Sequence, residues 1–196
     1  MNPDAIIIGG GVIGCSIALR LARAGLNVTV IERGRVGLEA SWAAAGMLAP
    51  QSETTGEEPL FDLAIRSRAM YAGFVQELRD LSGIDPEYRA EGTLCVAMNE
   101  DDEAGFAVWS AAQRRLGLNA TAVSVEDVHR WEPAVADSAV GGVFLPDDHQ
   151  VEKRKLMPAL EASIKKLGVQ VIEGREVTEI LAASNTVRRF ASDSPK

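Results

Sequence analysis

The sequence predicts an α/β fold built on parallel strands, and three features of its N-terminal region carry that prediction. Residues 5–8 are a short apolar run, rich in β-branched side chains and followed by glycines, as in a strand buried on both faces. Apolar residues then recur at helical spacing from Val12 to Ala24, and Gly25 supplies a stop signal. Residues 28–31 form a second apolar run. Together these segments predict a β-α-β unit with parallel strands.

The middle of the chain predicts a long loop followed by helices and strands. Residues 33–58 contain several glycines and show no regular period, and a loop of that length inside a compact domain is normally functional. Pro59 suits a first helical position, and the apolar spacing Leu60, Leu63, Ala64, Met70, Phe74, Leu78 and Leu81 predicts an amphipathic helix that Gly83 ends. A strand or bent hairpin is expected over residues 88–98. A helix capped by Asn99 should then run to Leu116.

The remaining segments continue this alternation until the pattern fails near the end. Ser124 and Asp127 have the spacing of a cap that opens a short helix, and residues 140–145 predict a strand. A helix over residues 156–167 should be kinked by Pro158 unless it starts late, and residues 169–172 and 177–181 are strand-like. After residue 181 no apolar period remains. We therefore expect a nucleotide-binding segment over 1–83, a partial second domain over 84–145, a return over 146–182 and a polar tail over 183–196.

Composition and charge exclude several classes of protein. The 196 residues are 46% apolar, which suffices for one ordinary domain, or a domain with a small appendage. The formal net charge of −8 opposes contact with nucleic acid or anionic lipid. No apolar run reaches the roughly 18 residues of a membrane span, and the start lacks a secretory signal, so a cytoplasmic location is expected. Cys15 and Cys95 are interpreted as small buried apolar residues, with a disulfide or metal ligation as the lesser alternative.

A glycine motif between the two expected strands indicates a dinucleotide site. Gly9, Gly11 and Gly14 have the G-x-G-x-x-G spacing, and Glu32 ends the second strand. The glycines allow a tight turn, approach of the backbone to a diphosphate, and close packing of helix on sheet. The amides of the first helical turn, at Val12 and Ile13, would face the phosphates, and Glu32 would accept hydrogen bonds from ribose hydroxyls. The motif leaves NAD and FAD both open.

The long loop contains a second candidate contact. Residues 41–47 read Ser-Trp-Ala-Ala-Ala-Gly-Met, and consecutive small residues let a backbone approach a flat ring system. A loop made small only by tight packing is the alternative interpretation. Met47 is the apolar residue expected to contact a ring or a substrate, and Trp42 either stacks near the ring or simply packs.

These segments, together with residues 145–152 (Leu-Pro-Asp-Asp-His-Gln-Val-Glu), resemble the FAD-dependent amino acid oxidases of the D-amino acid oxidase superfamily. The resemblance spans roughly residues 4–181 and looks closest to the bacterial glycine oxidases associated with thiamine biosynthesis. It implies a GR2-type flavoprotein, in which a Rossmann-like FAD-binding domain is interleaved with part of an α+β substrate domain. The residues implied to contact FAD are Gly9, Gly11, Val12, Ile13, Gly14, Glu32, Arg33, Ser41, Ala44, Ala45, Gly46, Met47 and Val177.

The resemblance also implies a reaction. Glycine or a small D-amino acid would transfer its α-hydrogen as hydride to FAD, oxygen would be reduced to hydrogen peroxide, and the imine would hydrolyse. No side chain of this sequence is implied as a catalytic base, and no metal is expected. The arginine that clamps the substrate carboxylate lies in a part of the relatives that has no counterpart here, so the chain looks like their N-terminal half and is expected to be inactive alone. His149 is interpreted as part of a surface turn.

Two other functions stay open, and one further expectation concerns assembly. The chain could be a noncatalytic fragment that holds FAD or ADP, or, less consistently with the loop, an NAD-dependent dehydrogenase. An incomplete sheet would leave an unpaired strand edge and exposed apolar surface, which favours a homo-oligomer.

Overall fold

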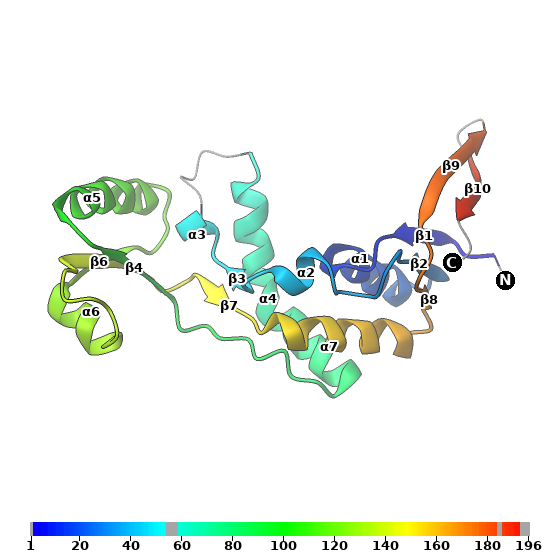
Figure 1. Cartoon of the computed structure of the whole chain (residues 1–196), viewed down its shortest axis with the longest axis horizontal. Coiled ribbons are helices and arrows are strands. Elements are labelled where there is room, and N and C mark those ends of the chain that lie inside the picture. The colour runs from blue at the N-terminus through cyan, green and yellow to red at the C-terminus, as the bar shows by residue number, and fades with distance from the viewer. Residues whose placement is uncertain (1, 54–58, 184–185, 193–196) are drawn as a thin grey trace. The chain divides into compact units, whose positions relative to one another are not determined.

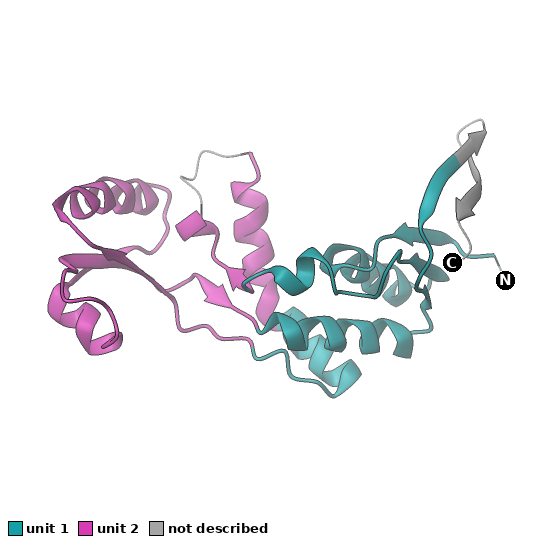
Figure 2. Cartoon of the chain, viewed as in Figure 1, with its two compact units in different colours: residues 1–45, 73–87, 152–196 teal, residues 46–72, 88–151 magenta. Residues whose placement is uncertain are grey.

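The structure, a computed structural model, describes residues 2–53, 59–183 and 186–192 (Figure 1). The chain divides into two compact units, shown in teal and magenta in Figure 2. Unit 1 contains residues 1–45, 73–87 and 152–196, and unit 2 contains residues 46–72 and 88–151. This division differs from the expected one in that residues 46–72 belong with unit 2 and the chain returns to unit 1 at residue 152.

Unit 1 is built on a three-stranded parallel sheet. Strands β1 (Ala5–Ile8), β2 (Val28–Ile31) and β8 (Gln170–Ile172) lie in the order β1-β2-β8. Pairing of β1 with β2 is parallel, with Ile7 opposite Val30, and helix α1 (Val12–Arg23) connects the two strands. The predicted β-α-β unit is therefore confirmed. Its sheet brings the ends of β2 and β8 together, because β8 pairs in parallel with β2.

Helix α7 (Lys153–Lys166) packs against α1 in unit 1 and buries Leu156, Leu160 and Ile164. It begins three residues earlier than the apolar spacing predicts, because the side chain of Glu152 accepts a hydrogen bond from the Arg154 amide at 2.8 Å and caps it. Pro158 lies inside this helix, which continues to Lys166 although proline cannot donate the usual backbone bond.

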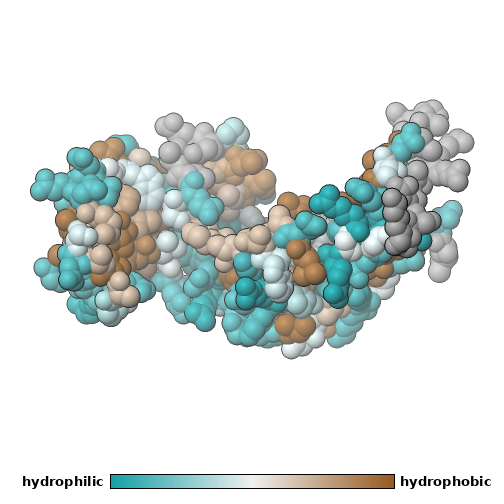
Figure 3. Space-filling view, viewed as in Figure 1, coloured by the Kyte–Doolittle hydropathy of each residue, from teal (hydrophilic) through white to brown (hydrophobic). Residues whose placement is uncertain are grey.

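Helix α4 (Phe61–Ser82) contributes its first part to unit 2 and its last part to unit 1. Its C-terminal half follows the predicted apolar pattern, since Leu78 is fully buried. Its N-terminal half does not, because Leu63 and Met70 are exposed, as is Leu60 just before the helix, whereas Phe61 is buried. Figure 3 shows the resulting apolar surface over this half of the helix. The apolar spacing therefore predicts the helix correctly, but it does not predict which of the apolar side chains are buried.

Unit 2 contains a three-stranded antiparallel sheet with a helix on each side (Figure 1). Its strands are β4 (Thr93–Ala97), β5 (Thr121–Ser124) and β6 (Gly141–Leu145), in the order β4-β6-β5. Helices α5 (Glu100–Arg115) and α6 (Val125–Trp131) cover them. Both predicted caps are confirmed: Asn99 accepts from the Asp102 amide at 2.8 Å, and Ser124 accepts from the Asp127 amide at 3.2 Å. Strand β4 is shorter than the hairpin expected over 88–98.

The core of unit 2 follows the alternation of side chains along β6. Val143 and Leu145 belong to a buried cluster against which Trp109 packs. Phe144 instead meets Trp131 in an edge-on contact with ring centroids 5.4 Å apart. Because successive side chains of a strand point to opposite faces of the sheet, β6 packs against α5 with one face and against α6 with the other.

The C-terminal segment is not the expected polar tail. Strand β9 (Val177–Ala183) continues beyond the predicted end, and β10 (Thr186–Ser192) pairs with it in an antiparallel hairpin. The backbone ladder forms although the sequence there has no apolar period, because strand pairing satisfies main-chain groups whatever the side chains are. Residues 193–196 lie outside the described part.

None of the helices among the described residues combines the length and the apolar character that a membrane crossing requires.

Candidate functional site

The glycine turn between β1 and α1 is packed most tightly at Gly14, whereas a Cβ at Gly9 would meet nothing within 4 Å. Gly9 adopts φ of +103°, a conformation that favours glycine, and its amide donates to the Ile31 carbonyl at 2.8 Å. A Cβ at Gly14 would lie 2.0 Å from the carbonyl oxygen of Gly9 and 3.2 Å from a methyl of Ile7. The close packing of helix on sheet predicted for this position is therefore present, and only glycine permits it.

Glu32 points into this turn. One carboxylate oxygen accepts a hydrogen bond from the Gly10 amide at 2.7 Å, and the other accepts from the Gly34 amide at 2.8 Å. The residue is 7% exposed, so its carboxylate forms part of the floor of the site. Each oxygen keeps acceptor capacity beyond its one backbone bond, because a carboxylate offers about four lone-pair positions. Hydroxyl donors of a ligand are suitable partners for that capacity.

The start of α1 provides an anion-binding end of a helix. Gly11 is the N-cap residue and supplies no side-chain cap, and the first turn contains no acidic residue. The hydroxyl of Ser41 accepts from the Val12 amide at 3.0 Å and would lie 3.2 Å from a Cβ at Gly11. Ser41 thus fixes the expected loop against the helix terminus. A helix N-terminus of this kind attracts phosphate groups through its amides and its dipole.

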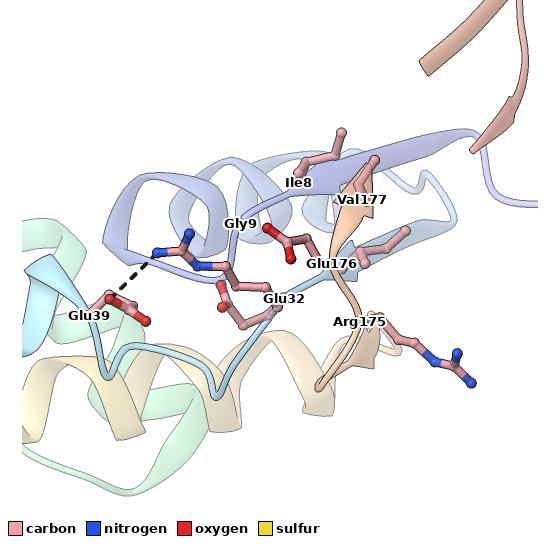
Figure 4. Close-up of a pocket in the computed structure, with 9 residues that line it drawn as sticks. Ile8, Gly9, Glu32, Glu39, Arg175, Glu176 and Val177 are labelled. Carbon is pink, nitrogen blue, oxygen red and sulfur yellow. Dashed lines mark ion pairs between the residues drawn. The ribbon is translucent and has the colours of Figure 1, made fainter. Parts of the chain in front are cut away.

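A cavity of about 370 Å³ opens beside Glu32 within unit 1 (Figure 4). It lies at the carboxyl ends of the parallel strands, where open α/β sheets bind ligands. Of the predicted contact residues, Gly9, Glu32, Arg33 and Val177 line it. Ile8, Ile31, Glu39, Arg175 and Glu176 also line it and were not predicted. Parallel pairing of β8 with β2 is the signal that could have found residues 175 and 176, since it brings the end of β8 to Glu32.

The small-residue loop is divided between the units. Ala44 follows helix α2 (Ala40–Ala43) in unit 1 and is exposed, as is Ala45. Gly46, with φ of +86°, begins unit 2 and accepts from the Val151 amide at 2.9 Å. Met47 lies in the short strand β3 (Met47–Leu48), which pairs with β7 (His149–Gln150), and is 46% exposed. The loop therefore presents accessible small side chains instead of a tightly packed interior.

The structure also contains a buried polar network in unit 2 that sequence reasoning missed. Asp148 is fully buried and pairs with Arg68 at 2.8 Å. Its carboxylate also accepts from the amides of Gln51 and Ser52, at the start of helix α3 (Pro50–Glu53). The next residue, His149, is not a free surface side chain, because its Nδ1 lies 2.6 Å from the Tyr88 hydroxyl. Among the described residues, no three His, Cys, Asp or Glu side chains form a group that could hold a metal ion.

Cys15 lies directly behind the glycine turn, fully buried, with its thiol donating to the Gly10 carbonyl at 3.4 Å. The pKa of this thiol is raised to about 12, chiefly by burial and to a lesser extent by the carboxylates of Glu161 and Glu32. The folded state therefore favours the neutral thiol. Its contribution to stability is complete below the ordinary thiol pKa and is lost as the pH rises toward 12.

We expect Cys15 to resist alkylation in the folded chain at mildly alkaline pH and to react once the chain is unfolded, because only the thiolate is nucleophilic. Mass spectrometry after iodoacetamide treatment, with and without denaturant, measures both states. Cys95, only partly buried, serves as the internal comparison, although burial raises its pKa too. Rapid labelling of Cys15 in the folded chain would contradict this expectation.

Unit 1 is thus an α/β unit with a glycine turn and a buried carboxylate at the ends of its parallel strands. The chain belongs to the FAD dependent oxidoreductase family, whose model matches residues 4–193. It is 35% identical over 185 residues to a glycine oxidase of Bacillus licheniformis, covering 94% of this chain and 49% of that protein. It is also 35% identical over 194 residues to the bifunctional protein ThiO/ThiG of a Synechocystis strain, covering 98% of this chain and 28% of that protein.

Solved structures give the same relationship. The glycine oxidase of Geobacillus kaustophilus superposes with a TM-score of 0.87 at 34% identity, over 91% of this chain and 48% of that chain. The glycine oxidase of Bacillus cereus superposes with a TM-score of 0.91 at 32% identity, over 99% of this chain and 54% of that chain. The expected α/β flavoprotein fold is therefore confirmed. The chain spans about half the length of these glycine oxidases.

Proposed function

We propose that unit 1 binds FAD and that the chain supplies the flavin-binding part of an amino acid oxidase of the glycine oxidase type. The observation that carries the proposal is the turn in which Glu32 accepts the Gly10 amide at 2.7 Å while Gly14 admits no Cβ. This turn leaves the backbone accessible to a diphosphate and sets a carboxylate beside it for a ribose. The residues present fit the cofactor that the family name states.

Each end of the cofactor would meet a different part of the chain. The amides at the start of α1, with Ser41, would hold the diphosphate, and the cavity lined by Glu32, Arg33 and Val177 would hold the adenosine. The backbone of residues 44 and 45, at the end of this stretch of unit 1, would approach the isoalloxazine. When bound, FAD supplies the acceptor for a hydride from the substrate α-carbon. The side chains described above bind and orient, and none of them is proposed to move a proton.

Glycine or a small D-amino acid is the proposed substrate, because the Bacillus licheniformis relative, at 35% identity, is named glycine oxidase. The second candidate is a chain that holds FAD or ADP without turnover. An NAD-dependent dehydrogenase, the third interpretation of the glycine motif, is not supported by the family match.

The test is FAD retention by the purified chain. We expect a yellow protein after incubation with FAD and removal of unbound cofactor, and we expect Glu32→Gln to bind FAD about 10- to 100-fold more weakly. The weakening follows because a glutamine places an NH₂ donor opposite one of the two amides that Glu32 accepts.

Peroxide release from glycine, sarcosine or D-alanine separates the two candidates. Peroxide formation that depends on FAD supports the oxidase and eliminates the noncatalytic chain, whereas FAD binding without peroxide supports the noncatalytic chain. A chain that binds NADH but not FAD would overturn the proposal.

A further inference from the structure

Glu176 joins the cavity through the connection that follows β8. The backbone of this connection is tied to the residues around Glu32: the Glu32 amide donates to the Ile172 carbonyl at 2.8 Å, and the Arg175 amide donates to the Glu32 carbonyl at 3.0 Å. The Gly174 amide donates to the Gly34 carbonyl at 3.0 Å. These bonds hold the backbone up to residue 175, and Glu176, the next residue, lines the cavity with an exposed side chain.

The side chains of this wall differ in direction. In Figure 4 the carboxylate of Glu176 is turned toward the same side as Glu32 and Gly9, whereas the guanidinium of Arg175 points away. The carboxylates of Glu32 and Glu176, which lie far apart in the sequence, thus face the same cavity. Glu32 already accepts two backbone amides, but within the part of the chain that the structure describes, no cation lies within ion-pair distance of Glu176.

Arg33 lines the cavity from the loop after β2, and its charge is balanced by a neighbouring carboxylate. Arg33 forms an ion pair with Glu39 at 3.7 Å, marked by the dashed line in Figure 4. Glu39 lines the cavity as well, so Arg33 adds no net positive charge there. The cavity lining thus contains three carboxylates, Glu32, Glu39 and Glu176, and two guanidinium groups, of which that of Arg175 points away, so the balance of charge is negative.

We infer that Glu176 is a specificity-determining residue of the adenosine pocket, which it restricts to adenosine with free ribose hydroxyls. The inference rests on the proposed function, which assigns adenosine to this cavity. A hydroxyl donates to a carboxylate, whereas a phosphate ester offers only acceptors and carries about −1.5 to −2 charges at neutral pH. The unpaired carboxylate of Glu176 repels such an ester in addition to the repulsion from Glu32.

The experiment compares ADP with 2′-phosphoadenosine 5′-diphosphate, which differs only in the ester on the ribose. Calorimetry gives the ratio of their affinities for the wild-type chain, Glu176→Gln and Glu176→Arg. Glu179→Gln is the matched control. Glu179 lies three residues after Glu176, its side chain is exposed, and it does not line the cavity, so the substitution removes the same charge outside the pocket.

We expect the wild-type chain to bind ADP more tightly than the phosphorylated ligand. Glu176→Gln should shift the affinity ratio about three- to tenfold toward the phosphorylated ligand, which is the size of a screened Coulomb interaction. Glu176→Arg should shift the ratio further, because it also adds a positive charge. Glu179→Gln should leave the ratio unchanged. The inference is overturned if Glu176→Gln leaves the ratio as in wild type or shifts it no more than Glu179→Gln does. A wild-type chain that binds neither ADP nor FAD would instead refute the proposed function, so the two failures are distinguishable.

Discussion

Replacing Gly14 by alanine is expected to weaken ADP and FAD binding by about tenfold or more and to destabilise unit 1. The added Cβ would lie 2.0 Å from the carbonyl oxygen of Gly9, which belongs to the backbone and cannot rotate away. The turn must therefore shift, and overpacking of this kind costs about 3 kcal/mol. A displaced turn also loses charge-assisted hydrogen bonds to the diphosphate, each worth about 1.5–3 kcal/mol. Loss of one or two such bonds weakens binding at least about tenfold, and commonly more than 100-fold.

Gly73→Ala is the matched control for this substitution. Gly73 lies in α4, its φ is not positive, and a Cβ there meets nothing within 4 Å. Alanine is the better helix former by roughly 0.5–1 kcal/mol, so this variant should be as stable as wild type or slightly more stable, with unchanged ADP affinity. Calorimetry of ADP binding and urea unfolding measure both variants. Retention of wild-type ADP affinity by Gly14→Ala would refute the assignment of this turn to the diphosphate.

The nucleotide site shows how much of a site local sequence can predict. The glycine turn and Glu32 were predictable because the strands, the helix and the spacing all lie within 32 consecutive residues. Glu176 was not, because it reaches the cavity only through the pairing of β8 with β2, more than 130 positions away along the chain. Glu39 was missed for a different reason: it lies in the loop, which has no period from which a direction can be inferred.

The errors in the fold have related causes. Strand β10 was missed because its sequence has no apolar alternation, while main-chain pairing with β9 alone defines it. On α4, helical spacing could not tell that Leu63 and Met70 would be exposed while Phe61 is buried, since burial depends on which elements cover the helix. Periodicity thus predicts the type of an element better than it predicts the environment of each face.

Asp148→Ala is expected to be the most destabilising substitution in unit 2, with a loss of about 3–5 kcal/mol. It leaves the guanidinium of Arg68, whose side chain is only 10% exposed, without its carboxylate partner. It also removes the acceptor for two amides at the start of α3, the nearer being Ser52 at 2.8 Å. Urea unfolding followed by circular dichroism measures the change in the free energy of unfolding.

Asp147→Ala is the control, because among the described residues this neighbouring carboxylate accepts from the exposed Asn119 amide group alone, and its loss should cost less than about 1 kcal/mol. The double variant Arg68→Met with Asp148→Ala tests the mechanism. If an uncompensated buried charge causes the loss, the double variant should be more stable than Asp148→Ala alone, since no charge is then left unpaired.

The amides of Gln51 and Ser52 still lack their acceptor in the double variant, so it should recover only part of the loss. Recovery to wild-type stability would mean that Asp148 contributes nothing to the start of α3 beyond pairing with Arg68. A double variant no more stable than Asp148→Ala would mean the opposite, that capping of α3 outweighs the ion pair. Neither result can be inferred from the Asp147-Asp148 turn in the sequence, because Arg68 lies 80 positions away and only the folded unit brings it to the carboxylate.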